Sequence, residues 1–172
     1  MSLLLRSCLT VPVVALLVWP ALQPGAGGFF TETERLGIWG LVAAAAFLTC
    51  VVLYCRDLER LLVAIDPGSR AASPRSVWLM MLVPFNFVED FFIVENVARS
   101  LEAQWRTRPG LAARGSGRAL GLTWCALQIV SLMPSALGLI AGALAVPPWL
   151  LHWAFVRRVR RDLITSGSLH QQ

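Results

Sequence analysis

The sequence feature that most constrains this chain is the stretch of residues 76–101, SVWLMMLVPFNFVEDFFIVENVARSL. It begins as an apolar segment and ends as a charged amphipathic helix, and the Pro-Phe-Asn sequence at positions 84–86 interrupts it. The apolar part, residues 77–83, covers only about 10 Å as a helix, far less than the bilayer core of about 30 Å. The topology of the chain therefore depends on whether this stretch crosses a membrane or enters it and returns.

The composition indicates that the whole chain is one integral membrane domain. Of its 172 residues, 56% are hydrophobic and 15% are charged, whereas a soluble domain carries about 25% charged residues. The long apolar segments predict an all-α, polytopic membrane protein with four transmembrane helices plus a re-entrant or amphipathic helix-break-helix element. No internal repeat is visible, so an inverted-repeat transporter is not suggested.

Each expected transmembrane helix is an apolar segment close to the 20 residues that a bilayer core requires. Residues 119–156 carry no formal charge, which predicts a hairpin of two helices with its turn at Pro134 to Gly138. Residues 1–26 also resemble a signal peptide, but Gln23 follows Ala21-Leu22 where a small residue is needed, so we expect an uncleaved first span. The expected spans are residues 3–22, 36–55, 119–134 and 137–156.

The arginines predict the orientation of these spans. All 15 basic residues are Arg, and 13 of them lie in three blocks beside apolar segments, which is the positive-inside pattern. We expect cytoplasmic loops at residues 56–75 and 102–118, a cytoplasmic basic tail at 157–172, and both termini in the cytoplasm. The use of Arg without Lys is typical of a GC-rich genome, so we expect a bacterial inner (plasma) membrane.

Basic loops on both sides of residues 76–101 favour a re-entrant element over a kinked third crossing. Asn86 is a good helix N-cap, and Glu89 three residues later predicts a capping box. A crossing helix would bury both Glu89 and Asp90, at about 2.5 kcal/mol or more for a carboxylate at the centre of the bilayer. A re-entrant element would hold both carboxylates near the lipid headgroups.

The polar side chains of this helix are the candidate functional cluster, because ionisable residues within a membrane often serve function. They could line a path for ions or protons. The alternative, which we favour, is a capped interfacial helix with a Glu95–Arg99 pair at the i, i+4 spacing. The cluster consists of Asn86, Glu89, Asp90, Glu95, Asn96 and Arg99.

Two further sets of residues are candidates for contacts in the membrane. Gly138 and Gly142 are four positions apart, so they predict a face for close helix packing. Trp149, His152 and Trp153 are expected at the membrane interface. The arginines of the tail are candidates for contact with anionic lipid; they are Arg157, Arg158, Arg160 and Arg161.

The sequence contains no recognisable catalytic, cofactor-binding or metal-binding motif, so we expect no enzyme and no cofactor. Asn86-x-x-x-Asp90 resembles part of a prenyltransferase metal motif, but Val94 stands where a further acid is needed. The four cysteines form no CxxC pair, which argues against a disulfide-forming enzyme, and we expect them to be buried thiols. No aromatic–basic platform accompanies the charge, so nucleic acid is not an expected partner.

Several of these residues carry a resemblance to a known class. The Pro84-Phe85-Asn86 break, the helix that ends Asn96-x-Ala98-x-Ser100-Leu101, and Gly121-Leu122 with the later Trp153 resemble a class of small bacterial multi-pass membrane proteins. That class is known only as a domain of unknown function, and the likeness covers residues 77–163. Usual members carry Trp, Gln or Pro after the Asn, where this chain has Glu89-Asp90. The resemblance implies a membrane protein and no catalytic residue.

The functional hypothesis is an accessory or scaffold subunit that packs against other membrane helices. Its partners would be the lipid bilayer and either another membrane protein or a second copy of the chain. The alternative hypothesis is a small channel or transporter that uses the polar cluster, and a membrane enzyme ranks third. Ion conductance in liposomes separates the first two hypotheses.

Overall fold

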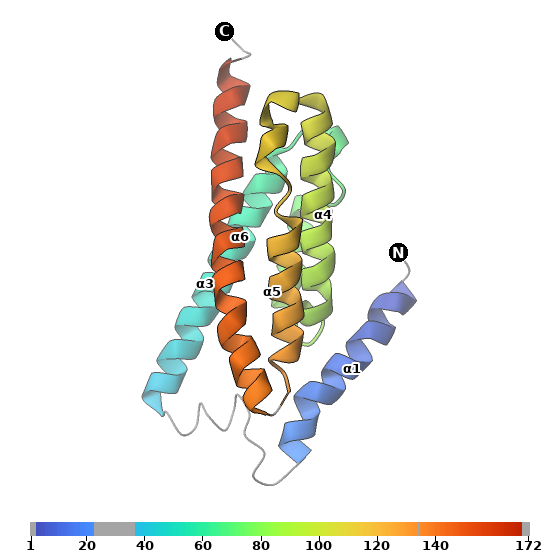
Figure 1. Cartoon of the computed structure of the whole chain (residues 1–172). Coiled ribbons are helices and arrows are strands. Elements are labelled where there is room, and N and C mark those ends of the chain that lie inside the picture. Colours follow the sequence, from blue (N-terminus) through green and yellow to red (C-terminus); the bar gives the residue numbers. More distant parts are fainter. Residues whose placement is uncertain (1–2, 23–36, 134, 170–172) are drawn as a thin grey trace.

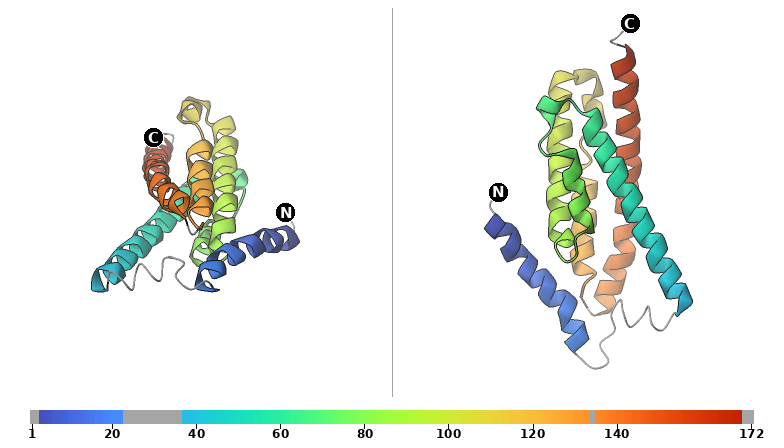
Figure 2. Two further views of the ribbon diagram at one scale, coloured as in Figure 1. Left: turned by 60° about the horizontal axis from the view of Figure 1, so that its bottom comes forward. Right: turned by 180° about the vertical axis from the view of Figure 1, so that it is seen from behind.

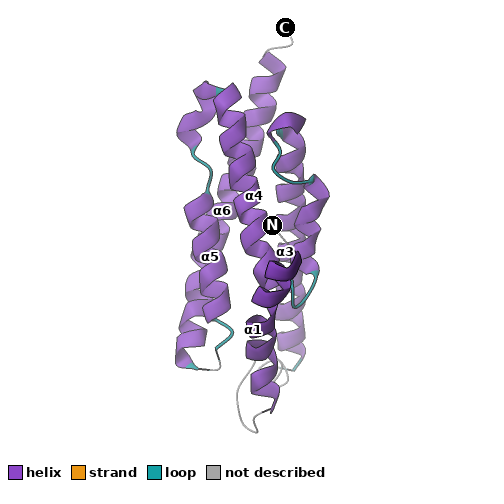
Figure 3. Cartoon of the chain, turned by 90° about the vertical axis from the view of Figure 1, so that its right-hand side faces the viewer, coloured by secondary structure: helices purple, strands orange, loops and turns teal. Residues whose placement is uncertain are grey.

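The computed structural model describes residues 3–22, 37–133 and 135–169, and every regular element within them is a helix (Figure 3). The predicted all-α class is therefore confirmed for the described part of the chain. In chain order the elements are α1 (Leu3–Leu22), α3 (Ile38–Ala64), η1 (Pro67–Ser69), η2 (Pro74–Met81), α4 (Asn86–Thr107), η3 (Pro109–Arg114), α5 (Arg118–Val130) and α6 (Ala136–Leu169).

The helices run up and down along one long axis (Figures 1 and 2). From the lower end of Figure 1, α3 rises, η2 returns part of the way, and α4 rises again. After η3, α5 descends and α6 rises along the full length of the molecule to the C-terminus. Helix α5 packs against both α4 and α6, α6 also packs against α3, and α1 lies against α4.

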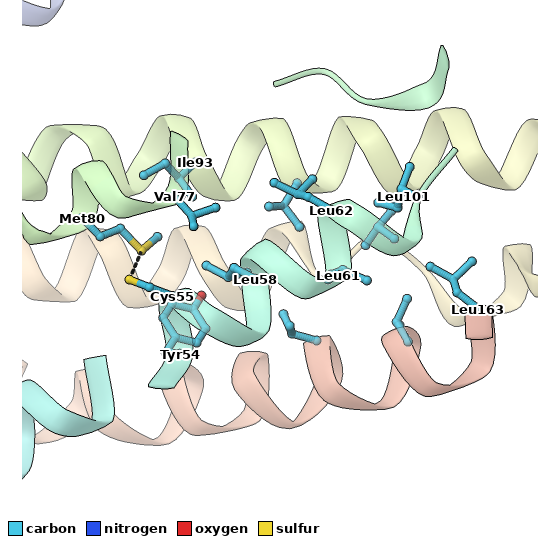
Figure 4. Packing of buried hydrophobic residues seen from close by; sticks show 14 of the residues in the cluster. Tyr54, Cys55, Leu58, Leu61, Leu62, Val77, Met80, Ile93, Leu101 and Leu163 are labelled. Atoms are coloured by element: carbon cyan, nitrogen blue, oxygen red, sulfur yellow. Dashed lines mark hydrogen bonds between the residues drawn. The ribbon is translucent and has the colours of Figure 1, made fainter. Parts of the chain in front are cut away.

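The hydrophobic core lies where α3, η2, α4 and α6 meet. Leu58, Leu61 and Leu62 follow the 3.6-residue period of a helix face, and they are fully or almost fully buried on α3. Val77 and Met80 of η2 close one side of this core, and the Cys55 thiol faces the Met80 sulfur at 3.8 Å (Figure 4). This core fastens the second half of α3 to the rest of the bundle.

The exposed surface divides along the long axis into an apolar end and an arginine-rich end. Large apolar side chains are exposed over the first halves of α3 and α6, for example Trp39 (74% exposed) and Leu139 (77% exposed). The ion pairs of arginine with acidic residues lie at the other end, between α4, α5, α6 and the end of α3. The surface is thus apolar where α3 and α6 begin and charged where they end.

Two helices, α3 and α6, are long and apolar enough to cross a membrane. Their most apolar windows are only 17% and 28% buried, whereas the core helix of a soluble protein is mostly buried. Apolar surface of this extent is unfavourable in water and favourable in lipid. These two helices therefore suggest a membrane protein.

The helices differ in length from the expected spans. The span predicted at 36–55 is part of α3, which continues to Ala64, and α6 runs unbroken past Pro147 and Pro148 to Leu169, so most of the predicted tail is helical. Helix α5 has 13 residues, about 20 Å, which is short for a crossing. Helix α5 ends at Val130 and α6 begins at Ala136, so the connection starts slightly before the predicted turn.

Residues 76–101 contain the expected break between two helical parts. The apolar part is a 3-10 helix, η2, and α4 begins at Asn86. The predicted capping box is wrong, because Phe85 is the N-cap of α4 and no side chain caps this end. The loop predicted at 102–118 is also partly wrong, because α4 continues to Thr107 and η3 follows.

Buried polar side chains of α4 fasten the segment that connects α3 to η2. The Gln104 side chain accepts a hydrogen bond from the backbone N–H of Asp66 at 2.7 Å and donates one to the Asp66 carboxylate at 2.7 Å. The Ser100 hydroxyl accepts a hydrogen bond from the backbone N–H of Ala71 at 2.9 Å. These bonds hold the start of η2 beside the second half of α4, so the two ends of the η2–α4 hairpin lie at the same end of the molecule.

Candidate functional site

The candidate site is a cavity of about 350 Å³ between α3, η2, α4, α5 and α6. Its volume falls at the lower end of the range for small-molecule pockets. Most of its lining is apolar, and a few polar side chains converge on it from three helices and a turn. These polar residues are Tyr54, Asn86, Asp90, Gln128 and Ser131.

Four buried polar atoms at this cavity have no hydrogen-bond partner. Three are acceptor oxygens, Asn86 Oδ1, Asp90 Oδ1 and Gln128 Oε1, and the fourth is the donor Nε1 of Trp149. A buried polar group without a partner costs about 1–3 kcal/mol. The concentration of such atoms around one cavity marks it as a place where a bound polar group would be favourable.

Asp90 is the most deeply buried of the acidic residues at this site, with 3% of its surface exposed. It stands one helical turn after Asn86 on α4, so both side chains lie on the same face of the helix. Helix α4 is outside the two candidate membrane spans. Burial, and secondarily the charge of Glu89, raise the pKa of the Asp90 carboxyl well above its usual value.

A group of aromatic rings forms the wall of the cavity opposite α4. The Trp124 and Trp149 rings are stacked with centroids 6.2 Å apart, and Tyr54 meets both edge-on at 5.6 Å and 6.0 Å. The Tyr54 hydroxyl and His152 Nδ1 form a buried hydrogen bond of 2.8 Å. This bond links α3 to α6 directly behind the cavity.

The predicted polar cluster of α4 does not form a single site. Asn86 and Asp90 line the cavity. Glu89, which directly precedes Asp90 in the sequence, is also buried. The backbone carbonyl of Asn96 accepts a hydrogen bond from Ser100, which is ordinary helix-surface chemistry. Glu95 and Arg99 lie nearer the arginine-rich end, so the six residues divide between two locations.

Glu95 takes part in a surface ion-pair network. It pairs with Arg99 at 2.9 Å, as the i, i+4 spacing predicted, and with Arg118 of α5 at 3.0 Å. Arg118 also pairs with Glu102 at 3.1 Å. These carboxylates are occupied by arginines, so this part of α4 serves to join α4 to α5.

The tail arginines predicted to contact lipid divide into two pairs. Arg160 pairs with the Asp57 carboxylate at 3.0 Å and Arg157 approaches the same carboxylate at 3.6 Å. Arg160 is mostly buried, so its prediction as a lipid contact is wrong; its guanidinium joins α6 to α3. Arg158 and Arg161 are exposed, and their role in lipid contact remains a prediction.

The predicted interfacial residues of α6 lie mostly inside the protein. His152 is 1% exposed and Trp149 is 7% exposed, so the expectation that their side chains face the membrane interface is wrong. Trp153 donates from its indole nitrogen to the Asp57 carboxylate at 2.8 Å. These side chains pair with α3 instead of with lipid.

The glycines bring helices close together within the chain. A side chain at Gly138 would collide with the backbone carbonyl of Met133 in the α5–α6 turn, and a Cβ at Gly142 would lie 3.5 Å from that of Ser131. At Gly121 of α5, a Cβ would lie 2.5 Å from Val94 of α4. Of these three glycines, Gly121 is the one at which α5 closely approaches α4.

Sequence reasoning missed Tyr54, Trp124 and Gln128 at the cavity and Asp57 on α3. Tyr54 is the only tyrosine of the chain and stands in an otherwise apolar segment. His152 is the only histidine in the uncharged stretch 119–156. A polar group inside an apolar helix requires a partner, so these two isolated residues were the available signal for their pairing.

Within the described residues, no group of three or more His, Cys, Asp and Glu side chains is arranged to hold a metal ion. The four cysteines are free thiols: Cys55 and Cys125 are buried, Cys50 is partly buried, and Cys8 is exposed, contrary to the expectation of four buried thiols.

Comparison with known proteins gives no relative for this chain. No family model matches it, and neither the curated proteins nor the solved structures contain a significant match.

Proposed function

We propose that this chain is an integral protein of a bacterial inner membrane and acts as an accessory or scaffold subunit that packs against other membrane helices. The observation that carries the proposal is the division of the surface into an apolar end and an arginine-rich end. Both termini would lie in the cytoplasm, in keeping with the positive-inside rule.

The exposed apolar side chains of α3 and α6 support insertion of these two helices in the bilayer. Helix α3 has about 40 Å of length and α6 about 51 Å. Both are longer than a bilayer core, so each would leave the lipid and continue into the cytoplasm. The ion pairs of Asp57 with Arg157 and Arg160 would then lie on the cytoplasmic side, where charges remain hydrated.

The η2–α4 hairpin would be a re-entrant element. Its support is the hairpin geometry, in which the start of η2 and the end of α4 lie at the arginine-rich end and the turn between them points toward the apolar end (Figure 2). Leu82, Val83 and Phe85 are exposed at this turn. An apolar turn is favourable in lipid, whereas charged flanks are favourable in water.

Single-cysteine labelling tests this topology. In a variant without native thiols, Ser73→Cys and Thr107→Cys should react only after the membrane is made permeable, because both positions would be cytoplasmic. Ser135→Cys, in the turn between α5 and α6, is the matched control and should react with an impermeant reagent on intact cells. Labelling of Ser73→Cys on intact cells would contradict the re-entrant topology.

The partner surface that we propose is the small-residue face of α3. Ala43 and Ala46, one helical turn apart, are exposed there between larger apolar side chains, and small residues let another helix approach closely. Ala46→Trp should release the partner in mild detergent while the thermal midpoint of the chain itself stays unchanged. The matched control is Leu139→Trp on the exposed face of α6, which should leave the complex intact.

The size of the complex distinguishes the two classes of partner. A purified, reconstituted Ala43→Cys variant without native thiols would form a disulfide-linked dimer if a second copy occupies the face. If only native membranes give a larger species, the partner is another membrane protein. A chain that elutes as a monomer in both cases, and whose behaviour Ala46→Trp does not change, would contradict the scaffold proposal.

The alternative function is a small channel or transporter. The observation in its favour is that Asn86 and Asp90 line a cavity, although Glu95 and Arg99 are engaged in ion pairs. Ion flux through liposomes that contain the purified chain, abolished by Asp90→Asn and retained by Glu102→Gln, would favour it over the scaffold.

A further inference from the structure

We propose that the cavity between α3, α4, α5 and α6 binds an amphiphile whose polar end carries a protonated amine and whose hydrocarbon chain extends into the surrounding lipid. This binding site goes beyond the proposed scaffold function and does not depend on it. The proposal rests on the unpartnered polar side chains that line the cavity, on its aromatic residues and on its exposed apolar residues.

The polar end of the cavity is built to accept hydrogen bonds. Asn86 Oδ1 and Asp90 Oδ1 come from adjacent turns of α4, and Gln128 Oε1 comes from α5. The three residues line the cavity, and these oxygens are buried beside it with no partner among the described residues, so that side-chain rotation would bring them to a group bound there. A primary ammonium group has three donors and no acceptor, so its hydrogen-bonding capacity matches these three oxygens.

The carboxyl group of Asp90 distinguishes a cation from other headgroups. Burial raises the pKa of Asp90, so the carboxyl keeps a proton while the cavity is empty. A bound ammonium group would favour the ionised carboxylate, which releases this proton and forms a stronger hydrogen bond with a charged donor than with a neutral one. A carboxylate or phosphate headgroup would instead meet three acceptor oxygens and be repelled. An alcohol carries a single hydroxyl donor, so it would leave two of the three oxygens without a partner.

The aromatic wall favours a cation at the same position. Trp124, Trp149 and Tyr54 line the cavity and pack against one another. The faces of such rings attract ammonium groups, and tryptophan is the most effective of the aromatic residues. The cavity therefore offers one carboxyl group and an aromatic wall to the same headgroup.

The rim of the cavity is apolar and exposed. Phe47 and Leu48 of α3, Val83 of the turn before α4 and Val146 of α6 all line the cavity, and between 46% and 68% of each is exposed. They belong to the apolar end of the molecule, on the surface that we place in lipid. The hydrocarbon chain of the ligand would leave the cavity between these side chains and enter the lipid. A water-soluble amine has no such chain, so it would make no apolar contact with them.

Photolabelling of the full chain tests the proposal. The protein is reconstituted in phosphatidylcholine nanodiscs with a long-chain primary amine that carries a diazirine close to its amino end. Labelled residues identified by mass spectrometry should be those of the cavity. Unlabelled octadecylamine should compete, whereas octadecanoic acid, octadecanol and ethylamine should each require at least a tenfold higher concentration.

Variants separate recognition of the amine from general partition into lipid. Asp90→Asn keeps the shape of the side chain. We expect half-maximal labelling of this variant to require a probe concentration at least about tenfold higher, because a hydrogen bond between charged groups is lost. Gln128→Leu removes a second acceptor and should weaken labelling severalfold. Glu102→Gln is the matched control, since Glu102 lies in the ion-pair network with Arg118, and it should label like the wild type.

The outcomes are distinct. Thermal unfolding of each variant shows whether it is folded, and Gln128→Leu provides the test if Asp90→Asn is not. Equal labelling of wild type, Asp90→Asn and Gln128→Leu would overturn the site. If octadecanol or octadecanoic acid competes as well as octadecylamine, the site does not require an amine headgroup. If ethylamine competes as well, the site does not require a hydrocarbon chain. Loss of the scaffold complex affects none of these measurements.

Discussion

Replacing Gly121 by alanine should destabilise the protein although alanine favours helix formation. A Cβ at this position would lie 2.5 Å from Val94 Cγ1 and 3.1 Å from His152 Nε2, both of which are buried. The first distance is far shorter than an ordinary carbon–carbon contact of about 3.5–4.0 Å. Helix α5 would have to move away from α4 and α6, or Val94 would have to adopt an unfavourable rotamer.

The expected magnitude follows from two opposing contributions. Gly→Ala inside a helix stabilises by about 1 kcal/mol, whereas overpacking a core costs about 1–3 kcal/mol. Displacement of His152 would also strain its hydrogen bond with Tyr54, which contributes about 1 kcal/mol. We therefore expect a net loss of about 1–2 kcal/mol in the free energy of unfolding.

A double-mutant cycle with Val94→Ala identifies the cause. Val94→Ala alone removes buried methyl groups, but it also creates space for the new Cβ at Gly121. The free-energy change of the double variant should therefore be smaller than the sum of the single changes, by about 1 kcal/mol or more. Unfolding is measured in mixed micelles under the same conditions for every variant.

The matched control is Gly142→Ala on α6, where the nearest contact would be an ordinary 3.5 Å. This variant should be as stable as the wild type or slightly more stable. If Gly121→Ala behaves like Gly142→Ala, or if it shows no coupling with Val94→Ala, the close contact between α4 and α5 is not as described.

Three further predictions concern buried polar groups. Tyr54→Phe leaves the ring nitrogen of His152 without its partner and should lower the free energy of unfolding by about 1–3 kcal/mol in denaturant titration. Asp57→Asn should cost about 1–3 kcal/mol, because Arg160 loses its ion pair, and the loss should be smaller in a variant that already lacks the Arg160 guanidinium. The raised pKa of Asp90 means that the folded protein keeps a proton that the unfolded chain releases. The stabilisation of the folded state by this bound proton is fully present below the ordinary Asp pKa and is lost as pH rises through the folded pKa. In Asp90→Asn this component of the pH dependence should be missing.

The sequence predicts the helices of this chain better than their ends. The break at Pro84-Phe85-Asn86 is present in the structure. It is local chemistry, since proline has no backbone N–H and disfavours a helical conformation of the residue before it, although α6 accommodates Pro147 and Pro148. The extension of α6 to Leu169 was not predicted, because the residues from 157 onward were expected to form a tail. Hydropathy marks the apolar window of a helix and not the point at which the helix stops.

The cavity could not be predicted, because its walls come from residues far apart in the chain. Phe47 and Trp149 line the same space, and no local pattern places them together. Asp90 was singled out as an ionisable residue in a membrane segment, yet its neighbour Gln128 carried no comparable signal. Arg160 illustrates the opposite error: a charge run predicts a solvated face, and only the fold reveals that Asp57 lies opposite one of its members.

The hydrogen bond between Tyr54 and His152 has a consequence for the order of synthesis. The two residues are 98 positions apart, so at about 5–20 residues per second the ribosome needs roughly 5–20 s to reach the second after the first. During this time the Tyr54 hydroxyl of the nascent α3 must find a temporary partner, such as water or a lipid headgroup. The last helix to be made supplies the permanent one, so cavity assembly is complete only when α6 has joined the bundle.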